Sequence, residues 1–323
     1  MTFTLIASTG AHFASFGPYV ASVNDAGVVA FAATLPDGTS GVFTGTGEEV
    51  REAPLPADVR AVRSHPDIND EGALSVYVEL ATGEQRVVLI SRGEASTLAD
   101  GFAEIGPAGP TMDAHGAVAF RGARLPGVPG VHVVADGIVR TVAEAGGRFG
   151  EFFGLPLLES GGAVVFRADR SDGVQGIYRA DGEVVRPVVE TGEMFAAIAP
   201  FPASTAGVLA FAATTAEGED GVWTLSGEEL ARAEGGEAFA SHRGALIAGD
   251  TLVRIATPPG GALGLFRGPD PEADRILGIG DAALGSVVED LAANAVSVDP
   301  VGHLALRISL EDGREAIVRT DVV

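Results

Sequence analysis

The chain has 323 residues, of which 46% are hydrophobic and only 6% aromatic, and its formal net charge is −23. This charge repels phosphate backbones and anionic lipid, so we expect neither a nucleic-acid nor a membrane partner. The absence of cysteine excludes disulfides and thiolate chemistry, and all 21 basic residues are arginines, which excludes lysine Schiff bases.

The N-terminus, MTFTLIASTG, contains neither a basic segment nor a long apolar stretch. No run of about 18 apolar residues occurs further on, so the sequence predicts no signal peptide and no membrane span. A cytoplasmic protein is the simplest interpretation, and a secreted mature chain stays open as the alternative.

Residues 24–43, NDAGVVAFAATLPDGTSGVF, have the pattern of a tight turn, a strand, a second turn and a second strand. The unit returns along the chain about every 45 residues. Its seven anchor glycines are Gly27, Gly72, Gly116, Gly162, Gly207, Gly249 and Gly302. Four short strands per unit, with no helical period, are typical of propeller blades.

The two ends of the chain predict how the ring of blades closes. Residues 1–13 align without a gap to 137–149 and to 183–195, which are fourth strands leading into a next blade. The seventh unit ends after its third strand. We therefore predict an all-β fold: one seven-bladed β-propeller domain over residues 1–323, with four antiparallel strands per blade. The N-terminal strand, residues 2–8, completes the last blade and leaves no open edge.

The first unit also carries a longer repeat pattern, NxxGxVAFxAxL. The matching residues are Phe13, Phe16, Asn24, Gly27, Val29, Ala30, Phe31, Ala33, Leu35, Gly41 and Phe43. In this pattern the chain resembles a bacterial family of tandem-repeat β-propellers, and the likeness covers essentially its whole length. The resemblance implies the propeller fold. It implies no particular activity, because the family has no general assigned one; many members look secreted, whereas this chain has no evident export signal.

Residues that recur from unit to unit are expected to serve packing. Five units share a phenylalanine position, occupied by Phe13, Phe102, Phe149, Phe195 and Phe239. Four units carry an arginine five residues after the anchor glycine: Arg121, Arg167, Arg254 and Arg307. Buried arginines need partners, and acids stand near the ends of the fourth strands: Glu144, Glu190 and Glu234. We expect Arg–Glu bridges, with an anion-clamping arginine ring as the alternative.

Candidate functional residues lie in the loops that join the fourth strand of one blade to the first strand of the next, here called the connecting loops. These loops build the face on which propellers usually bind ligands. His65 and His242 share one register position, seven residues before the anchor glycine, and Ser22, Asp67 and Thr111 share the position five before it. Strand alternation predicts that both positions face the channel.

These residues leave two function classes open. The first is a propeller that binds a small molecule. Arg63 and Arg243 favour an anionic ligand, and further contacts would come from His12, Tyr19, Ser22 and Thr111. The second is a lyase, cyclase or hydrolase using His65, Asp67 and His242 for acid–base catalysis. A lectin is disfavoured, because the chain has one Trp and three Tyr for repeated sugar sites. We predict a monomer without a cofactor or metal site.

Overall fold

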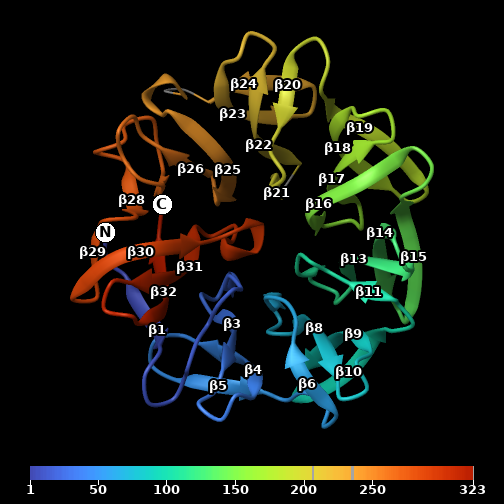
Figure 1. Cartoon of the computed structure of the whole chain (residues 1–323), viewed down its shortest axis with the longest axis vertical. Coiled ribbons are helices and arrows are strands. Elements are labelled where there is room, and N and C mark those ends of the chain that lie inside the picture. The colour runs from blue at the N-terminus through green and yellow to red at the C-terminus, as the bar shows by residue number, and fades with distance from the viewer. Residues whose placement is uncertain (206, 234–235, 323) are drawn as a thin grey trace.

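The computed structural model describes residues 1–205, 207–233 and 236–322. Seven antiparallel sheets surround a central axis, as the repeats predict (Figure 1). Among the described residues no helix is long and apolar enough to cross a membrane.

The strands of a blade follow one another outward from the axis, as β25 near the axis and β28 near the periphery show (Figure 1). Blade one consists of β2 (Ser22–Val23), β3 (Val29–Thr34), β4 (Ser40–Gly45) and β5 (Val50–Ala53). Blade two consists of β6 (Val59–Val62), β7 (Asp67–Ile68), β8 (Leu74–Leu80), β9 (Gln85–Ser91) and β10 (Glu94–Ala99). Blade three consists of β11 (Glu104–Ile105), β12 (Thr111–Met112), β13 (Val118–Leu125), β14 (Val128–Ala135) and β15 (Ile138–Glu144). Two short pieces thus replace the first strand of blades two and three.

Blade four consists of β16 (Phe149–Leu158), β17 (Val164–Arg170), β18 (Gln175–Asp181) and β19 (Val184–Glu190). Blade five consists of β20 (Phe195–Ile198), β21 (Ala203–Thr205), β22 (Val208–Thr215), β23 (Asp220–Ser226) and β24 (Glu229–Arg232). Blade six consists of β25 (Ser241–Ala248), β26 (Thr251–Thr257), β27 (Gly264–Phe266) and β28 (Arg275–Gly278). A 3-10 turn, η1 (Gly236–Ala238), precedes blade six.

Blade seven is built from both ends of the chain. It consists of β29 (Ala282–Ala283), β30 (Ser286–Ala292), β31 (His303–Leu310), β32 (Glu315–Asp321) and the N-terminal β1 (Thr4–Ser8). A second 3-10 turn, η2 (Ala295–Ser297), stands where other blades continue their first strand. Since β1 pairs antiparallel with β32, the predicted closure is confirmed. Ile6 of β1 also packs against Gly45 of blade one, so β1 joins the first and last blades.

The anchor turns explain why the sequence repeats an asparagine and a glycine. All seven anchor glycines have positive φ, from 56° to 107°, a region that other residues rarely adopt. Asn24 Oδ1 accepts a hydrogen bond from Val28 N of its own turn at 3.0 Å, and its Nδ2 donates to Asn69 O of the next blade at 3.0 Å. Asn69 repeats both bonds, to Ala73 N and Asp113 O. Each asparagine thus fixes its own turn and links two blades.

Removing this link from blade two should cost measurable stability. We expect Asn69→Ala to lower the free energy of unfolding by about 2 kcal/mol, because a buried turn loses an acceptor and the blade contact loses a donor. Asn69→Asp keeps the acceptor and should cost about half as much. The measurement is urea unfolding, with the exposed Glu71→Ala from the same turn as control. Equal stability of Asn69→Ala and Glu71→Ala would contradict this role.

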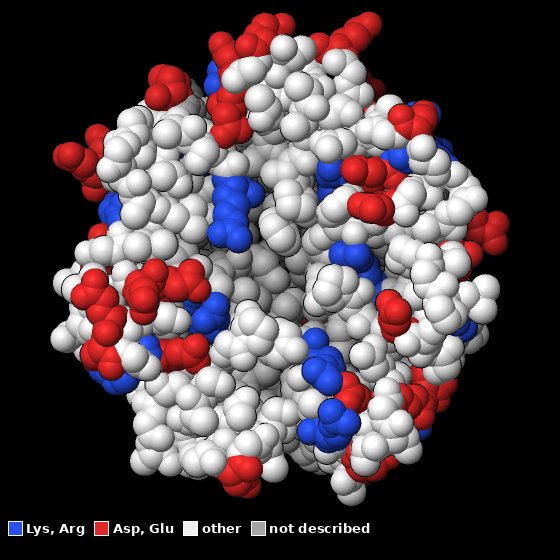
Figure 2. Space-filling model, in the orientation of Figure 1, with Lys and Arg blue, Asp and Glu red and all other residues white. Residues whose placement is uncertain are grey.

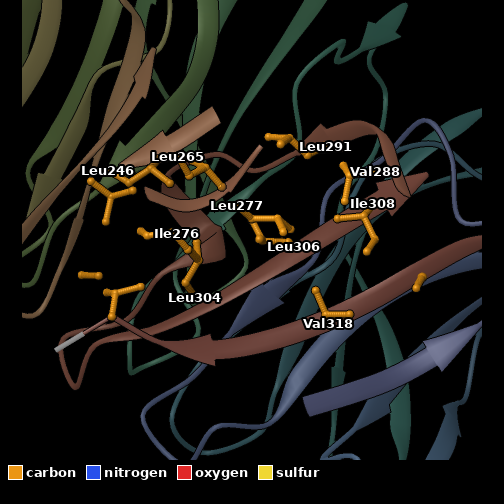
Figure 3. Packing of buried hydrophobic residues seen from close by; sticks show 14 of the residues in the cluster. Leu246, Leu265, Ile276, Leu277, Val288, Leu291, Leu304, Leu306, Ile308 and Val318 are labelled. Atoms are coloured by element: carbon orange, nitrogen blue, oxygen red, sulfur yellow. The ribbon is translucent and has the colours of Figure 1, made fainter. Parts of the chain in front are cut away.

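Aromatic residues and aliphatic clusters fill the spaces between the blades. The repeated phenylalanines are all buried, and each meets an aromatic ring of its own blade, as Phe13 meets Phe31 and Phe43. The clusters of Phe13, Phe102, Phe149 and Phe195 include residues of the neighbouring blade, so these four have the expected packing role. The cluster of Phe239 lies within blade six. Figure 3 shows the aliphatic counterpart between blades six and seven, where Leu246 and Leu265 lie near Leu304 and Leu306.

Candidate functional site

Apolar side chains close the central channel near its middle. Val20, Leu155, Leu157, Ala295 and Val296 come from blades one, four and seven and belong to one hydrophobic cluster. A separate cavity lies on each side of this plug, and Ala295 lines both. The channel therefore has two distinct mouths, one among the connecting loops and one among the anchor turns.

The connecting-loop mouth holds a cavity of about 310 Å³. Of its 16 lining residues, 14 are apolar, and the other two are Arg243 and Asn294. Leu155, Leu246 and Leu265 are buried, whereas Phe201 is 41% exposed and stands at the rim. Figure 2 shows this face: arginine side chains gather around the central hollow, and most acidic side chains lie further out.

The anchor-turn mouth has the opposite character. Its cavity, of about 230 Å³, is lined by Asp25, Asp67, Asp70 and Asp299, and its described lining contains no arginine. Burial, followed by the charges of Asp70 and Asp299, raises the pKa of Asp25. Within the described part of the chain, no group of three or more His, Cys, Asp or Glu residues has a geometry that could hold a metal ion.

His65 lies at the level of the plug. Its Nε2 is 3.3 Å from Asn294 Nδ2, which comes from blade seven across the channel, and its Nδ1 is 3.3 Å from Pro66 O. A side chain on Gly109 of blade three would overlap the ring, so glycine is required there. Burial lowers the pKa of His65 to about 4. The ring is therefore neutral at pH 7, and its Nε2 can accept a hydrogen bond from the Asn294 amide.

Asp67 and Thr111 line the anchor-turn cavity, but their polar atoms join the inner strands of adjacent blades. Asp67 Oδ2 accepts a hydrogen bond from Met112 N of blade three at 2.6 Å, and Thr111 Oγ1 donates to Pro156 O of blade four at 2.7 Å. Burial raises the pKa of Asp67 to about 7. Ser22, at the same register position, is fully buried and its Oγ has no hydrogen-bond partner among the described residues. At this register position the structure therefore places two buried inter-blade hydrogen bonds, made by Asp67 and Thr111, and a buried Ser22 hydroxyl.

A β-bulge in β25 separates His242 from Arg243. His242 pairs with Ala256 and Gly244 with Ile255, which leaves Arg243 as the extra residue. The bulge turns Arg243 into the connecting-loop mouth, while the His242 side chain is fully buried beside Phe239. His242 Nδ1 lies 3.4 Å from Asp220 Oδ2 without hydrogen-bond geometry, and burial lowers the pKa of the ring. His65, Asp67 and His242 therefore lie in three different surroundings.

The remaining sequence candidates lie outside the cavity of the connecting-loop mouth, here called the mouth cavity. Arg63 Nε donates to Glu79 Oε2 at 2.7 Å, so its charge is paired. Tyr19 is half-buried in a different cavity between blades one and two, and burial raises the pKa of its phenol. His12 is exposed and packs edge-on against Phe13.

The expected Arg–Glu bridges have different partners in the structure. Arg121 Nη1 donates to Gly154 O at 2.9 Å, and Arg167 pairs with Asp169 of its own strand at 2.5 Å. Arg307 lies near Asp290 and Glu315. Glu190 accepts from Tyr178 and faces Arg148 and Arg170, while Glu234 lies outside the described residues. The partners are backbone carbonyls in the first strand of the next blade and acids of the same blade.

Asn294 is a site residue that the sequence interpretation missed. Its Oδ1 accepts from Val296 N, its backbone N–H bonds Ser297 Oγ, and its amide contacts His65. The signal was the spacing Asn-x-x-Ser, which forms a capping box at the start of η2.

Comparisons with known proteins identify only the fold. No protein-family model and no curated protein matches the chain. A solved prolyl endopeptidase is similar, at a TM-score of 0.65 and 12% identity over 99% of this chain and 48% of that one. The β-propeller domain of the Trilobed protease from Pyrococcus furiosus is similar at a TM-score of 0.61 and 10% identity, over 98% of this chain and 97% of that one.

YCF48 bound to D1 peptide gives a TM-score of 0.52 and 11% identity over 99% of this chain and 98% of that one. The chain spans about half the length of the prolyl endopeptidase. At these identities the likeness establishes the architecture and nothing about chemistry. The chain is similar to β-propellers, in agreement with its ring of seven sheets.

Proposed function

We propose that the chain is a binding propeller whose connecting-loop mouth takes a small organic anion. The observation that carries this proposal is the position of Arg243. Among the residues that the structure describes, it is the one charged residue lining the mouth cavity, and no carboxylate lies within ion-pair distance of it. An exposed arginine turned into a concave apolar surface is suited to hold a carboxylate by two parallel hydrogen bonds.

The acid–base alternative has weaker support. Catalysis of that kind needs each acid or base within hydrogen-bond reach of the proton that it transfers to or from a bound substrate. His65 is enclosed by Asn294 and Gly109, Asp67 lines the other mouth, and His242 is buried between blades five and six. The binding of D1 peptide by YCF48, a neighbour in fold alone, is compatible with a non-catalytic role.

A thermal-shift screen tests the proposal. Carboxylic acids should raise the melting temperature of the wild-type chain, and the matching neutral amides should not, because only the acids complement the guanidinium. Arg243→Ala should weaken acid binding about tenfold or more, as expected for the loss of a charge-assisted hydrogen bond. Arg51→Ala, which removes an exposed arginine of the outer strand β5, is the control. Acids that stabilise all three chains equally would refute the site.

A further inference from the structure

The composition of the mouth cavity restricts the ligand beyond its charge. Below the rim, the buried residues Leu155, Leu246 and Leu265 give the cavity an aliphatic floor. Leu246 and Leu265 belong to the cluster between blades six and seven in Figure 3, so the floor is part of the core. A ligand that reaches this floor must present apolar surface to it.

The polar groups of the lining offer little for a second polar group on a ligand. Asn294 uses its Oδ1 on Val296 N, its backbone N–H on Ser297 Oγ, and its Nδ2 faces His65. Only Arg243 remains among the polar side chains that line the cavity. A sugar or a polyol would therefore lose hydrogen bonds to water for hydroxyls that find no partner here.

At the rim of the mouth cavity the charged Arg243 lies beside the apolar Phe201. Arg243 comes from the bulge of β25, and the neighbouring Gly244 contacts Phe201 of blade five. Arg243 and Phe201 therefore both line the cavity and lie close to one another across the contact between blades five and six. A ligand whose anionic head is held by Arg243 can place its tail against Phe201 and the leucine floor.

We propose that the ligand is a monocarboxylate with an unbroken apolar body, a straight-chain or arylalkyl acid, bound head-out and tail-in. This inference rests on the proposed function and narrows it to one ligand class. The cavity volume of about 310 Å³ lies at the lower end of small-molecule pockets, which are roughly 300 to 1,000 Å³. It suits a tail of several carbons rather than a long lipid chain.

Calorimetric titration with butanoate, hexanoate, octanoate and decanoate, each below its micellar concentration, tests the inference. Affinity should rise about fourfold with each methylene until the cavity is filled. Arg243→Ala should weaken all four acids by a similar factor and leave the chain-length dependence intact, since head and tail contacts are separate. The corresponding amides should bind more weakly than the acids.

A cavity-filling variant supplies the matched control. Ala293 lines the mouth and is only partly buried, so Ala293→Phe should weaken octanoate more than butanoate. Ala114→Phe, in the lining of the opposite cavity, should change neither. Acids that bind through Arg243 without any dependence on chain length would overturn the ligand class and leave the proposed function standing. Failure of every acid to bind would overturn both.

Discussion

Replacing Ile6 with aspartate should open the ring. Ile6 is the residue of β1 that is 5% exposed and packs with Phe13, Phe31 and Ile317, so a carboxylate there loses the apolar contact and has no partner. We expect the free energy of unfolding to fall by about 4 kcal/mol or more. Because β1 also supplies the outer strand of blade seven, the edge of β32 becomes exposed and the variant should self-associate.

The neighbouring residue provides the control for this variant. Leu5 lies on the same strand but is 41% exposed, so Leu5→Asp should cost less than about 1 kcal/mol. Urea unfolding gives the stabilities, and light scattering gives the association state. Closure by β1 would be contradicted if Ile6→Asp remained monomeric and no less stable than Leu5→Asp.

Replacing Asp67 with asparagine should change how stability depends on pH. The pKa of Asp67 is raised by burial from 3.8 to about 7 in the folded chain. Between these values the unfolded chain releases the proton and the folded chain keeps it, so this residue lowers stability as pH rises. Asparagine does not ionise. The free energy of unfolding of Asp67→Asn, relative to that of the wild type, should therefore rise by up to about 4 kcal/mol from pH 4 to pH 8.

His65 should act in the opposite direction over nearly the same range. Burial lowers its pKa from 6.5 to about 4, so the unfolded chain binds a proton that the folded chain does not, and stability falls as pH drops through this window. In the wild type the two effects oppose each other. The free energy of unfolding of Asp67→Asn should therefore rise from pH 4 to pH 6.5. That of His65→Gln should fall over the same range.

Urea unfolding at several pH values measures both variants against the wild type. Asp37→Asn is a useful comparison, because hydrogen bonds from Thr39 lower the pKa of this exposed carboxyl. Its difference from the wild type should stay nearly constant above about pH 4 and change only below it, in the opposite direction to that of Asp67→Asn. A difference between Asp67→Asn and wild type that stays constant from pH 4 to 8 would mean that Asp67 is ionised in the fold.

The sequence was sufficient for the architecture because the repeat encodes it locally. Gly27 and its six counterparts need positive φ, and this requirement is visible in every copy. The closure could also be predicted, since residues 1–13 match internal fourth strands and β1 does pair with β32. These features depend on neighbouring residues and on comparison of one repeat with another.

The site was less predictable because it depends on contacts between blades. Asp67 and Met112, or Thr111 and Pro156, are partners 45 residues apart, and nothing in either segment indicates that the polar atoms are used. Strand alternation predicts a common side for His242 and Gly244, but a bulge brings Arg243 to the mouth instead. Arg243 was a candidate from its loop position, whereas the apolar character of its surroundings required the fold.

The most direct test is to locate a bound acid. Crystals soaked with 8-bromooctanoate should show the anomalous signal of bromine over the floor formed by Leu246 and Leu265, with the carboxylate at Arg243. Crystals of Arg243→Ala soaked in the same way should show a weaker signal. Bromine in the anchor-turn cavity beside Asp67, or at neither mouth, would contradict the assignment of the connecting-loop face as the binding face.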